Sequence, residues 1–238
     1  MSMLARSHDA PPTGTLPPGQ RAVNGFPRFG THMGRPAPAV PAEPVITIRG
    51  PSTGEFDVSL AVLAVLPRRE LLADFHCVSG WSATNLCWDG VSFEAFYRTI
   101  VEPALVPGTE ITHVVFRGLD GFRAVFVLED ALADRVLLAD RLDGRPLGPD
   151  HGAPVRVVSP DQYGYMSIKH LCRIEVHSGE PPSRDLGILD RLFKSHPRAR
   201  VAEEERHGSL PGWLVRPVYR AIKAPLLRLC ARGTTGTA

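Results

Sequence analysis

The stretch between residues 112 and 178 constrains the fold most, because it reads as a succession of short β-strands. Its runs of Val, Ile, Leu and Phe are divided by glycine, aspartate and proline, and the run at 45–50 alternates in the same way. The later runs cover residues 112–118, 122–130, 135–144, 154–160 and 171–178. No repeat of fixed period occurs. We therefore expect an α+β domain, rich in strands, with helices inserted between the strands rather than alternating with them.

Two segments before this stretch have the spacing of short helices. We expect residues 57–67 to form one that Asp57 or Ser59 caps and that Pro67 ends. Residues 92–105 place their apolar side chains at helical intervals. The chain has 238 residues, of which 43% are hydrophobic, and this is enough apolar material for a buried core.

The ends of the chain differ from its middle in composition. Residues 1–44 are rich in proline and glycine with few apolar side chains, so alone they cannot bury much surface. We expect a flexible arm over residues 1–20, one main domain over 21–180 and a C-terminal extension over 181–238. Within the first part, NGFPRFGTHMG (24–34) favours a loop that lies on the domain, with a free arm as the alternative.

The C-terminal extension is locally basic, because no acidic residue follows Glu205. Between residues 212 and 233, apolar and basic side chains recur at helical intervals, and we expect Pro217 and Pro225 to interrupt that helix. Two interpretations stay open. The helix contacts a membrane surface or a partner protein, or it packs its apolar side on its own domain.

Charge and cysteine content exclude several classes of protein. A formal net charge of +2 and an isoelectric point of about 8.4, with no aromatic residues interleaved among the basic ones, do not indicate a nucleic-acid partner. The four cysteines form no CxxC pair, so neither a zinc knuckle nor a disulfide framework is expected. The first residues lack the apolar stretch and paired arginines of export signals, and we expect a cytoplasmic protein.

Cys77, within ADFHCVSGWS, admits three explanations. It is a small buried hydrophobe, a nucleophilic thiol with His76, His113 or His151 as its base, or a soft thiolate ligand to a transition metal. No signature of the known cysteine hydrolases surrounds it. The third explanation requires that the other metal ligands come from a cofactor, and so it requires a cofactor site elsewhere in the chain.

A candidate for that site follows in HGAPVRVVSPDQYGYMSIKHL (151–171). Arg156 offers a planar fork of donors to a phosphate, and Lys169 adds a compact positive charge. Gly164 and Ser167 allow backbone N–H groups to approach an anion closely. The segment therefore predicts an anion site, with two solvated basic residues beside a strand as the alternative.

Taken in order, the motifs FHCVSGWS and WDGVSF, and then the run from LEDAL to PDHGAPVRVVSPDQYGYMSIKHLCRIEV, resemble one known domain. It is the molybdopterin-binding domain shared by sulfite oxidases and the bacterial protein-methionine-sulfoxide reductase catalytic subunit. The resemblance spans about residues 24–176. It implies a mixed, strand-rich fold of the sulfite-oxidase type, a Mo-molybdopterin cofactor and a molybdopterin-dependent oxidoreductase.

The resemblance also implies roles for single positions. Cys77 matches the cysteine that gives its sulfur to molybdenum, which would make it the metal ligand and the catalytic residue. The cofactor-binding positions would be Asn24, Pro27 and Arg28 in the N-terminal loop, His151 and Arg156, and the phosphate-holding Ser167, Ile168 and Lys169. A thiolate suits a high-valent metal, and basic donors suit a phosphorylated pterin.

Two positions depart from the sulfoxide-reductase branch. Gly118 stands where that branch has a threonine, and His151 where it has an asparagine. Nothing matches the haem domain or the immunoglobulin-like domain of sulfite oxidases. We therefore expect a compact relative that carries out two-electron oxygen-atom transfer on a small S- or N-centred substrate, with reduction of methionine sulfoxide or a similar compound as the alternative.

The expected partners are a small oxo-donor or oxo-acceptor substrate and a separate electron carrier, since no haem, flavin or iron–sulfur motif is present. Candidates for lining the substrate pocket are Arg28, Arg123, Arg156 and Tyr163. The competing classes are a Cys-His thiol hydrolase and a non-catalytic interaction module.

Overall fold

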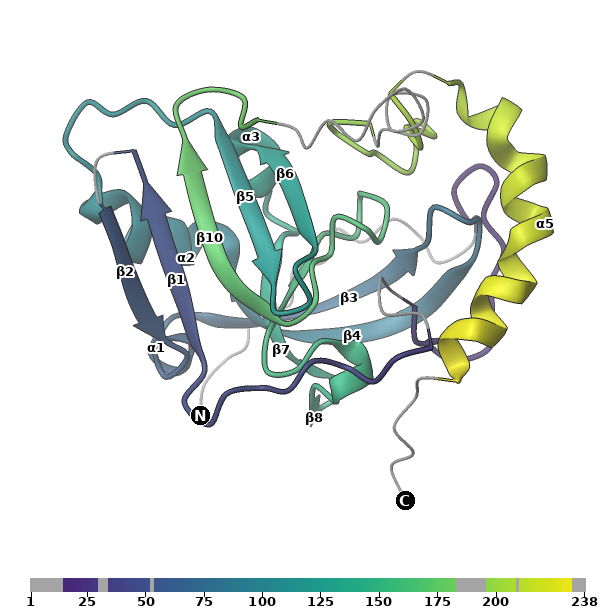
Figure 1. The fold of residues 1–238 in the computed structure, drawn as a ribbon, viewed down its shortest axis with the longest axis horizontal. Helices are drawn as coiled ribbons and strands as arrows, with labels where there is room; N and C mark the ends of the chain where they lie inside the picture. The colour runs from purple at the N-terminus through teal and green to yellow at the C-terminus, as the bar shows by residue number, and fades with distance from the viewer. Residues whose placement is uncertain (1–14, 30–33, 52–53, 183–195, 209, 233–238) are drawn as a thin grey trace.

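The computed structural model describes residues 15–29, 34–51, 54–182, 196–208 and 210–232. Within them, two β-sheets enclose the main hydrophobic core, and a long helix lies at one side of the molecule (Figure 1). The first sheet has five strands in the order β2-β1-β10-β5-β6. Their bounds are β1 Val45–Gly50, β2 Gly54–Ser59, β5 His113–Gly118, β6 Arg123–Val127 and β10 Leu171–His177.

The second sheet carries the segments that form the candidate site. Its strands follow the order β3-β4-β7-β8, and β9 also pairs with β7. All of these pairs are antiparallel, whereas β1 and β10 of the first sheet run parallel. The bounds are β3 Arg68–His76, β4 Ser82–Ser92, β7 Leu137–Leu142, β8 Arg145–Pro146 and β9 Arg156–Val158.

Short helices fill the connections, as expected for an α+β domain with inserted helices. Ser92 caps α2 by accepting a hydrogen bond from the backbone of Ala95 at 3.1 Å, and Phe93 packs edge-on against Phe116 of β5 with 4.8 Å between ring centroids. The helical elements are α1 Val62–Val65, α2 Phe93–Phe96, η1 Tyr97–Val101, η2 Glu102–Ala104, α3 Leu128–Ala131 and η3 Pro149–His151.

Two expectations about local structure were wrong or incomplete. The helix expected over residues 57–67 is only the single turn α1, because Asp57 and Ser59 belong to β2, where they pair with β1. We also did not predict β3 and β4, the longest strands described. Asn85 at φ 59° interrupts the alternation of β4, and a register shift falls where β4 meets β7 at Gly90.

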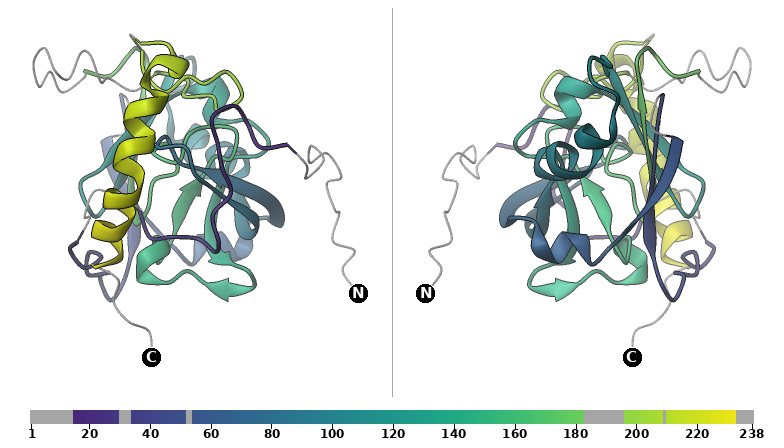
Figure 2. Two further views of the ribbon diagram at one scale, coloured as in Figure 1. Left: turned by 90° about the vertical axis from the view of Figure 1, so that its right-hand side faces the viewer. Right: turned by 90° about the vertical axis from the view of Figure 1, so that its left-hand side faces the viewer.

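The C-terminal helix α5, Gly212–Ala231, runs without the expected interruption at Pro217 and Pro225. Both prolines lie at exposed positions, so the carbonyl groups that lose an N–H partner can reach solvent. Figure 2 shows α5 on the outside of the molecule, beside the N-terminal segment. None of the helices within the described residues combines the length and apolarity that crossing a bilayer demands.

We predict that Gly90→Ala lowers the free energy of unfolding by about 3 kcal/mol. A β-carbon at position 90 would lie 2.1 Å from the carbonyl oxygen of Leu138, so β4 and β7 would have to separate. Gly148→Ala is the matched control, because nothing lies within 4 Å of the β-carbon that it adds and its φ is −79°. Urea unfolding measures both variants, and equal midpoints would contradict the close contact of the two strands.

Candidate functional site

A tight hairpin between β3 and β4 fixes the position of Cys77. The backbone N–H of Cys77 donates to Trp81 at 2.8 Å, and the N–H of Gly80 donates back to Cys77 at 2.9 Å. Gly80 has φ 86°, and a β-carbon there would lie 2.9 Å from the carbonyl oxygen of Gly19. Gln20 adds a side-chain hydrogen bond to the Cys77 carbonyl at 3.2 Å. The turn therefore holds the thiol against the N-terminal segment.

The thiol of Cys77 is buried in an aromatic environment that includes Trp81 and Phe75. Burial raises its pKa to about 11, although the hydroxyl of Ser79, 3.1 Å from the sulfur, and the charge of Arg206 act in the opposite direction. In the protein alone, Cys77 is thus a neutral thiol. A metal ion that binds the sulfur would have to displace this proton.

The N-terminal loop lies across this hairpin, as the sequence predicted for residues 24–34, of which the structure describes all but 30–33. Phe26 packs against Phe75 at 4.9 Å and stacks on the ring of His151 at 4.6 Å between centroids. The backbone N–H of Val23 donates to Ser82 at 2.9 Å. Gln20, the last residue of the expected arm, is already buried. Asn24 is exposed, and Pro27 is half-buried.

Arg156 is the centre of a buried group of positive charges. It is fully buried in β9 and donates to the carbonyl oxygens of His151 at 3.0 Å and Ser167 at 2.9 Å. Its guanidinium also lies over the rings of Trp88 at 5.1 Å and Phe75 at 5.5 Å. Burial lowers its pKa to about 9. The protein thus holds a charged group away from water without giving it a carboxylate partner.

Three further basic side chains join Arg156. Burial, and then the charges of Arg156 and Arg28, lower the pKa of Lys169 to about 7, and burial lowers the pKa of His151 to about 4. Lys169 donates to the backbone oxygen of Asp150 at 2.6 Å, and Arg28 forms an ion pair with the Asp150 carboxylate at 3.1 Å. Among the described residues, the ion pair with Asp150 and the more distant charges of Asp120 and Asp143 offset this group only in part, since the pKa values of Lys169 and His151 stay lowered. Such an arrangement favours binding of an anion.

The remaining predicted phosphate-holding residues, Ser167 and Ile168, make structural contacts next to the buried basic side chains. Ser167 accepts a hydrogen bond from the backbone of Ser159 at 3.1 Å, and the side chain of Ile168 is buried in the main core. The backbone N–H of Gly164, which we expected to contact an anion, instead donates to the carbonyl oxygen of His76 at 2.7 Å. It is therefore not available to an anion in this structure. A β-carbon at Gly118 would lie 2.3 Å from the carbonyl oxygen of Lys169, which explains why this position carries no side chain.

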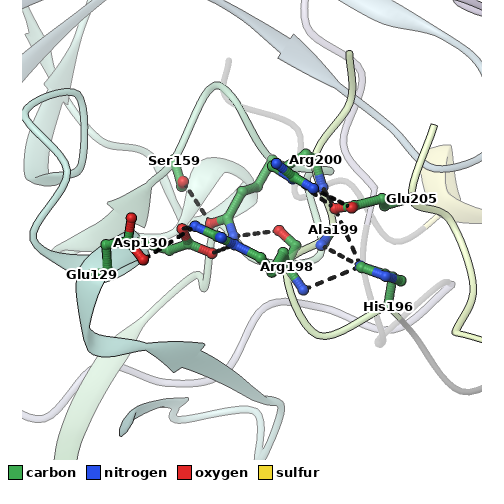
Figure 3. A network of polar contacts seen from close by, with 9 residues as sticks. Glu129, Asp130, Ser159, His196, Arg198, Ala199, Arg200 and Glu205 are labelled. Carbon is green, nitrogen blue, oxygen red and sulfur yellow. Dashed lines mark hydrogen bonds and ion pairs between the residues drawn. The ribbon is translucent and has the colours of Figure 1, made fainter. Parts of the chain in front are cut away.

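Residues 196–208 are anchored to the domain by the polar network in Figure 3. Arg198 donates to Asp130 of α3 at 2.9 Å, and its carbonyl oxygen accepts from Gln162 at 2.6 Å. Backbone hydrogen bonds run from Tyr163 to Ala199 at 2.9 Å and from Val201 to Asp161 at 3.0 Å. Residues 196–208 are therefore packed against the domain through specific hydrogen bonds.

This anchored segment places Arg206 beside the thiol. Only 1% of Arg206 is exposed, and its guanidinium donates to the carbonyl oxygen of Val78, the residue after Cys77. It lies over the ring of Tyr163 at 5.1 Å. Its Nε and Nη2 find no hydrogen-bond acceptor among the described residues, and the carboxylate of Glu204 is 3.7 Å from Nη2. Arg206 is thus a buried cation with N–H groups to offer.

The structure brings most of the predicted residues together. Tyr163 lies under Arg206, and Arg28 lies with the buried basic group. Arg123, in contrast, is on β6 of the other sheet and donates to Pro182 at 3.2 Å, so it does not line this site. Sequence reasoning missed Arg206 and Gln20, because each acquires its role only through contacts with distant parts of the chain.

Comparison with known proteins identifies the family. The family described as oxidoreductase molybdopterin binding domain matches residues 32–184. The chain belongs to this family. It is therefore a molybdopterin-dependent oxidoreductase, and its cofactor is Mo-molybdopterin. The predicted fold of the sulfite-oxidase type and the predicted cofactor are both confirmed.

Individual relatives agree with this assignment. The chain is 31% identical to "Uncharacterized oxidoreductase YuiH" of Bacillus subtilis over 72% of this chain and 84% of that protein. It is 26% identical to the "Protein-methionine-sulfoxide reductase catalytic subunit MsrP" of Burkholderia mallei over 68% of this chain, and it spans about half of that protein, 53%. The sulfane dehydrogenase SoxCD of Paracoccus pantotrophus shares the fold, with a TM-score of 0.55 and 20% identity over 69% of this chain and 46% of that one.

The side chains around Cys77 fit the cofactor. Nδ1 of His151 and Nε1 of Trp88 are buried and have no hydrogen-bond partner in the described part of the chain. Together with Arg156 and Lys169 they offer donors and positive charge to a phosphorylated, nitrogen-rich ligand. No cluster of three His, Cys, Asp or Glu side chains suited to a metal occurs among the described residues, so a metal held at Cys77 would take its other ligands from the pterin.

We predict that the cofactor-free protein becomes more stable as pH rises from about 7 to about 9, by about 2 kcal/mol. The folded chain holds Lys169 with a pKa of about 7, below its ordinary value of 10.5. The unfolded chain therefore binds more protons in this window, and the free energy of unfolding rises with pH. Urea unfolding at each pH measures the slope, and Lys169→Met should remove it. An unchanged slope in Lys169→Met would contradict the buried position of this lysine.

Proposed function

We propose that this enzyme carries out two-electron oxygen-atom transfer on a small S- or N-centred substrate at a molybdenum that Cys77 ligates. The observation that carries the proposal is the position of Cys77. Its buried sulfur belongs to the same cluster as Phe75 and Trp88, whose rings pack against Arg156. The charge of Arg206 also acts on this sulfur. When bound, the molybdenum cofactor supplies the redox chemistry, and the side chains bind, orient and shield.

Each side chain has a separate task in this proposal. Arg28, Arg156 and Lys169 hold the phosphate end of the pterin, and the stacked rings of Phe26 and His151 close one wall against water. The hairpin around Cys77 fixes the direction of the sulfur. Arg206 donates to the backbone of Val78, next to Cys77, and its Nε and Nη2 have no hydrogen-bond acceptor among the described residues. In this proposal these two groups bind an oxygen of the substrate, with Tyr163 packed on the guanidinium.

Two directions of reaction fit this geometry. Oxidation of an oxyanion such as sulfite suits the buried cation of Arg206, and the same cation also suits the oxygen of an S-oxide. Several relatives named as protein-methionine-sulfoxide reductase catalytic subunits, at 26–28% identity, favour reduction of methionine sulfoxide or a similar compound as the second candidate. In both cases a separate carrier exchanges electrons with the enzyme.

The contacts of Cys77 argue against the thiol hydrolase considered from the sequence. The sulfur lies 3.1 Å from the hydroxyl of Ser79, whereas the ring of His76 lies 2.8 Å from the hydroxyl of Ser82. His151 lies in the buried basic group, and His113 is on β5 of the other sheet. A thiol with a pKa of about 11 and without a histidine base is a poor nucleophile.

Metal and pterin content test the proposal directly. We predict that protein expressed in a host able to make molybdopterin contains about one molybdenum and one pterin per chain. It should oxidise sulfite with an artificial acceptor, or reduce S-oxides or N-oxides with a reduced viologen. Cys77→Ser should abolish the activity while pterin remains, because Arg156 and Lys169 are intact. Cys172→Ser is the control for loss of a half-buried thiol. Full activity in Cys77→Ser would refute the proposal.

Arg206 provides a second prediction. We expect Arg206→Lys to keep the buried charge but to lose the planar set of donors, and to lower kcat/KM for the active substrate by roughly 10- to 100-fold with molybdenum content unchanged. Arg220→Gln is the control, because Arg220 is exposed on α5. An Arg206→Lys enzyme with wild-type kcat/KM would show that substrate does not meet this guanidinium.

A further inference from the structure

One face of α5 packs on the domain through polar contacts of its side chains and backbone. Arg216 forms an ion pair with Glu204 at 2.8 Å, and the hydroxyl of Tyr219 lies 2.8 Å from His207. Near the end of the helix, the carbonyl oxygen of Cys230 accepts from Arg28 at 3.2 Å. The interpretation that the helix docks on its own domain therefore holds for this face.

Beside this packed face, α5 carries a stripe of exposed apolar side chains. Leu214, Val218 and Ile222 follow one another at intervals of four residues, and they are 49%, 57% and 38% exposed. Trp213, at the start of the helix, is 65% exposed. Spacing of this kind places the three aliphatic side chains in one stripe along the helix. A row of large apolar side chains in water indicates an interaction surface.

The remaining charged side chains of α5 that have no carboxylate partner all have the same sign. Arg220 and Arg228 are exposed and Lys223 is half-buried, and none of them forms an ion pair with a described carboxylate. No acidic residue follows Glu205 in the whole sequence. An apolar stripe with tryptophan at one end and unopposed basic side chains beside it matches the interface of an anionic lipid bilayer. The same apolar stripe on a second copy of the chain would bring no negative charge to these basic side chains.

We propose that α5 lies in the plane of an anionic lipid surface, with Leu214, Val218 and Ile222 in the acyl boundary and Arg220 and Arg228 at the headgroups. The inner face of the helix stays on the domain, so binding requires no rearrangement of the fold. The candidate site then lies directly behind the membrane-bound helix. This proposal stands on α5 alone and is independent of the reaction proposed above.

Trp213 reports on this contact in the intact enzyme. Of the three tryptophans, Trp81 and Trp88 are fully buried, so a change in emission on binding comes from Trp213. We expect a blue shift, and co-sedimentation of the protein, with vesicles of phosphatidylcholine and phosphatidylglycerol. Both effects should be weak with phosphatidylcholine alone and should fall as salt increases. Equal binding to both kinds of vesicle, or no binding to either, would overturn the proposal.

Paired variants separate the apolar and the charged contributions. V218E/I222E should lose binding, whereas V65E/L72E adds the same charge at exposed apolar positions elsewhere, 80% and 51% exposed, and should bind like wild type. R220Q/R228Q removes only charge and should weaken partitioning roughly 30-fold. If V218E/I222E does not fold, R220Q/R228Q still tests the proposal, because it changes only charged side chains on the exposed side of the helix. Unchanged partitioning of R220Q/R228Q, or a dimer in solution that V218E/I222E dissolves, would refute the lipid contact.

Discussion

The buried positive charge around Arg156 is the constraint on which the rest of this structure depends. An arginine, a lysine and a histidine are buried together there, and burial lowers the pKa of all three. Such an arrangement is unfavourable for an isolated chain and becomes favourable when an anion binds. In the proposal above, the phosphorylated cofactor supplies that anion. Part of the stability of the fold would then depend on its ligand.

Both ends of the chain complete a site whose centre lies in the family-matched residues 32–184. Gln20 and Phe26 come from before this region, and Arg206 and α5 come from after it. The network of Arg198 and Asp130 fixes the later segment, and so it decides where Arg206 lies. Substrate recognition in this proposal thus rests on residues outside the shared domain, which is where members of one family are free to differ.

Sequence reasoning succeeded where neighbouring residues carry the signal. The β-branched runs predicted β1, β5, β6, β7, β9 and β10 correctly. Of the positions that the resemblance named, Arg28, His151, Arg156 and Lys169 lie together in the structure. Sequence reasoning failed for β3, whose Arg, Glu and Asp side chains hide the alternation, and for β4, which Asn85 and Gly90 interrupt. Arg206 could not be found, because EEERHG reads as a solvated charge run. Only its anchoring 128 residues away, at Val78, shows that it is buried.

The two prolines of α5 require that the outer surface of this helix stays hydrated. Pro217 and Pro225 have no N–H, so the carbonyl oxygens of Trp213 and Ala221 lose their ordinary helical partners. Both acceptors need donors from outside the helix, and a dry hydrocarbon contact would leave them unsatisfied. Whatever covers this helix has to bring water or polar groups with it. The helix can therefore rest at a hydrated boundary, but it cannot sink below one.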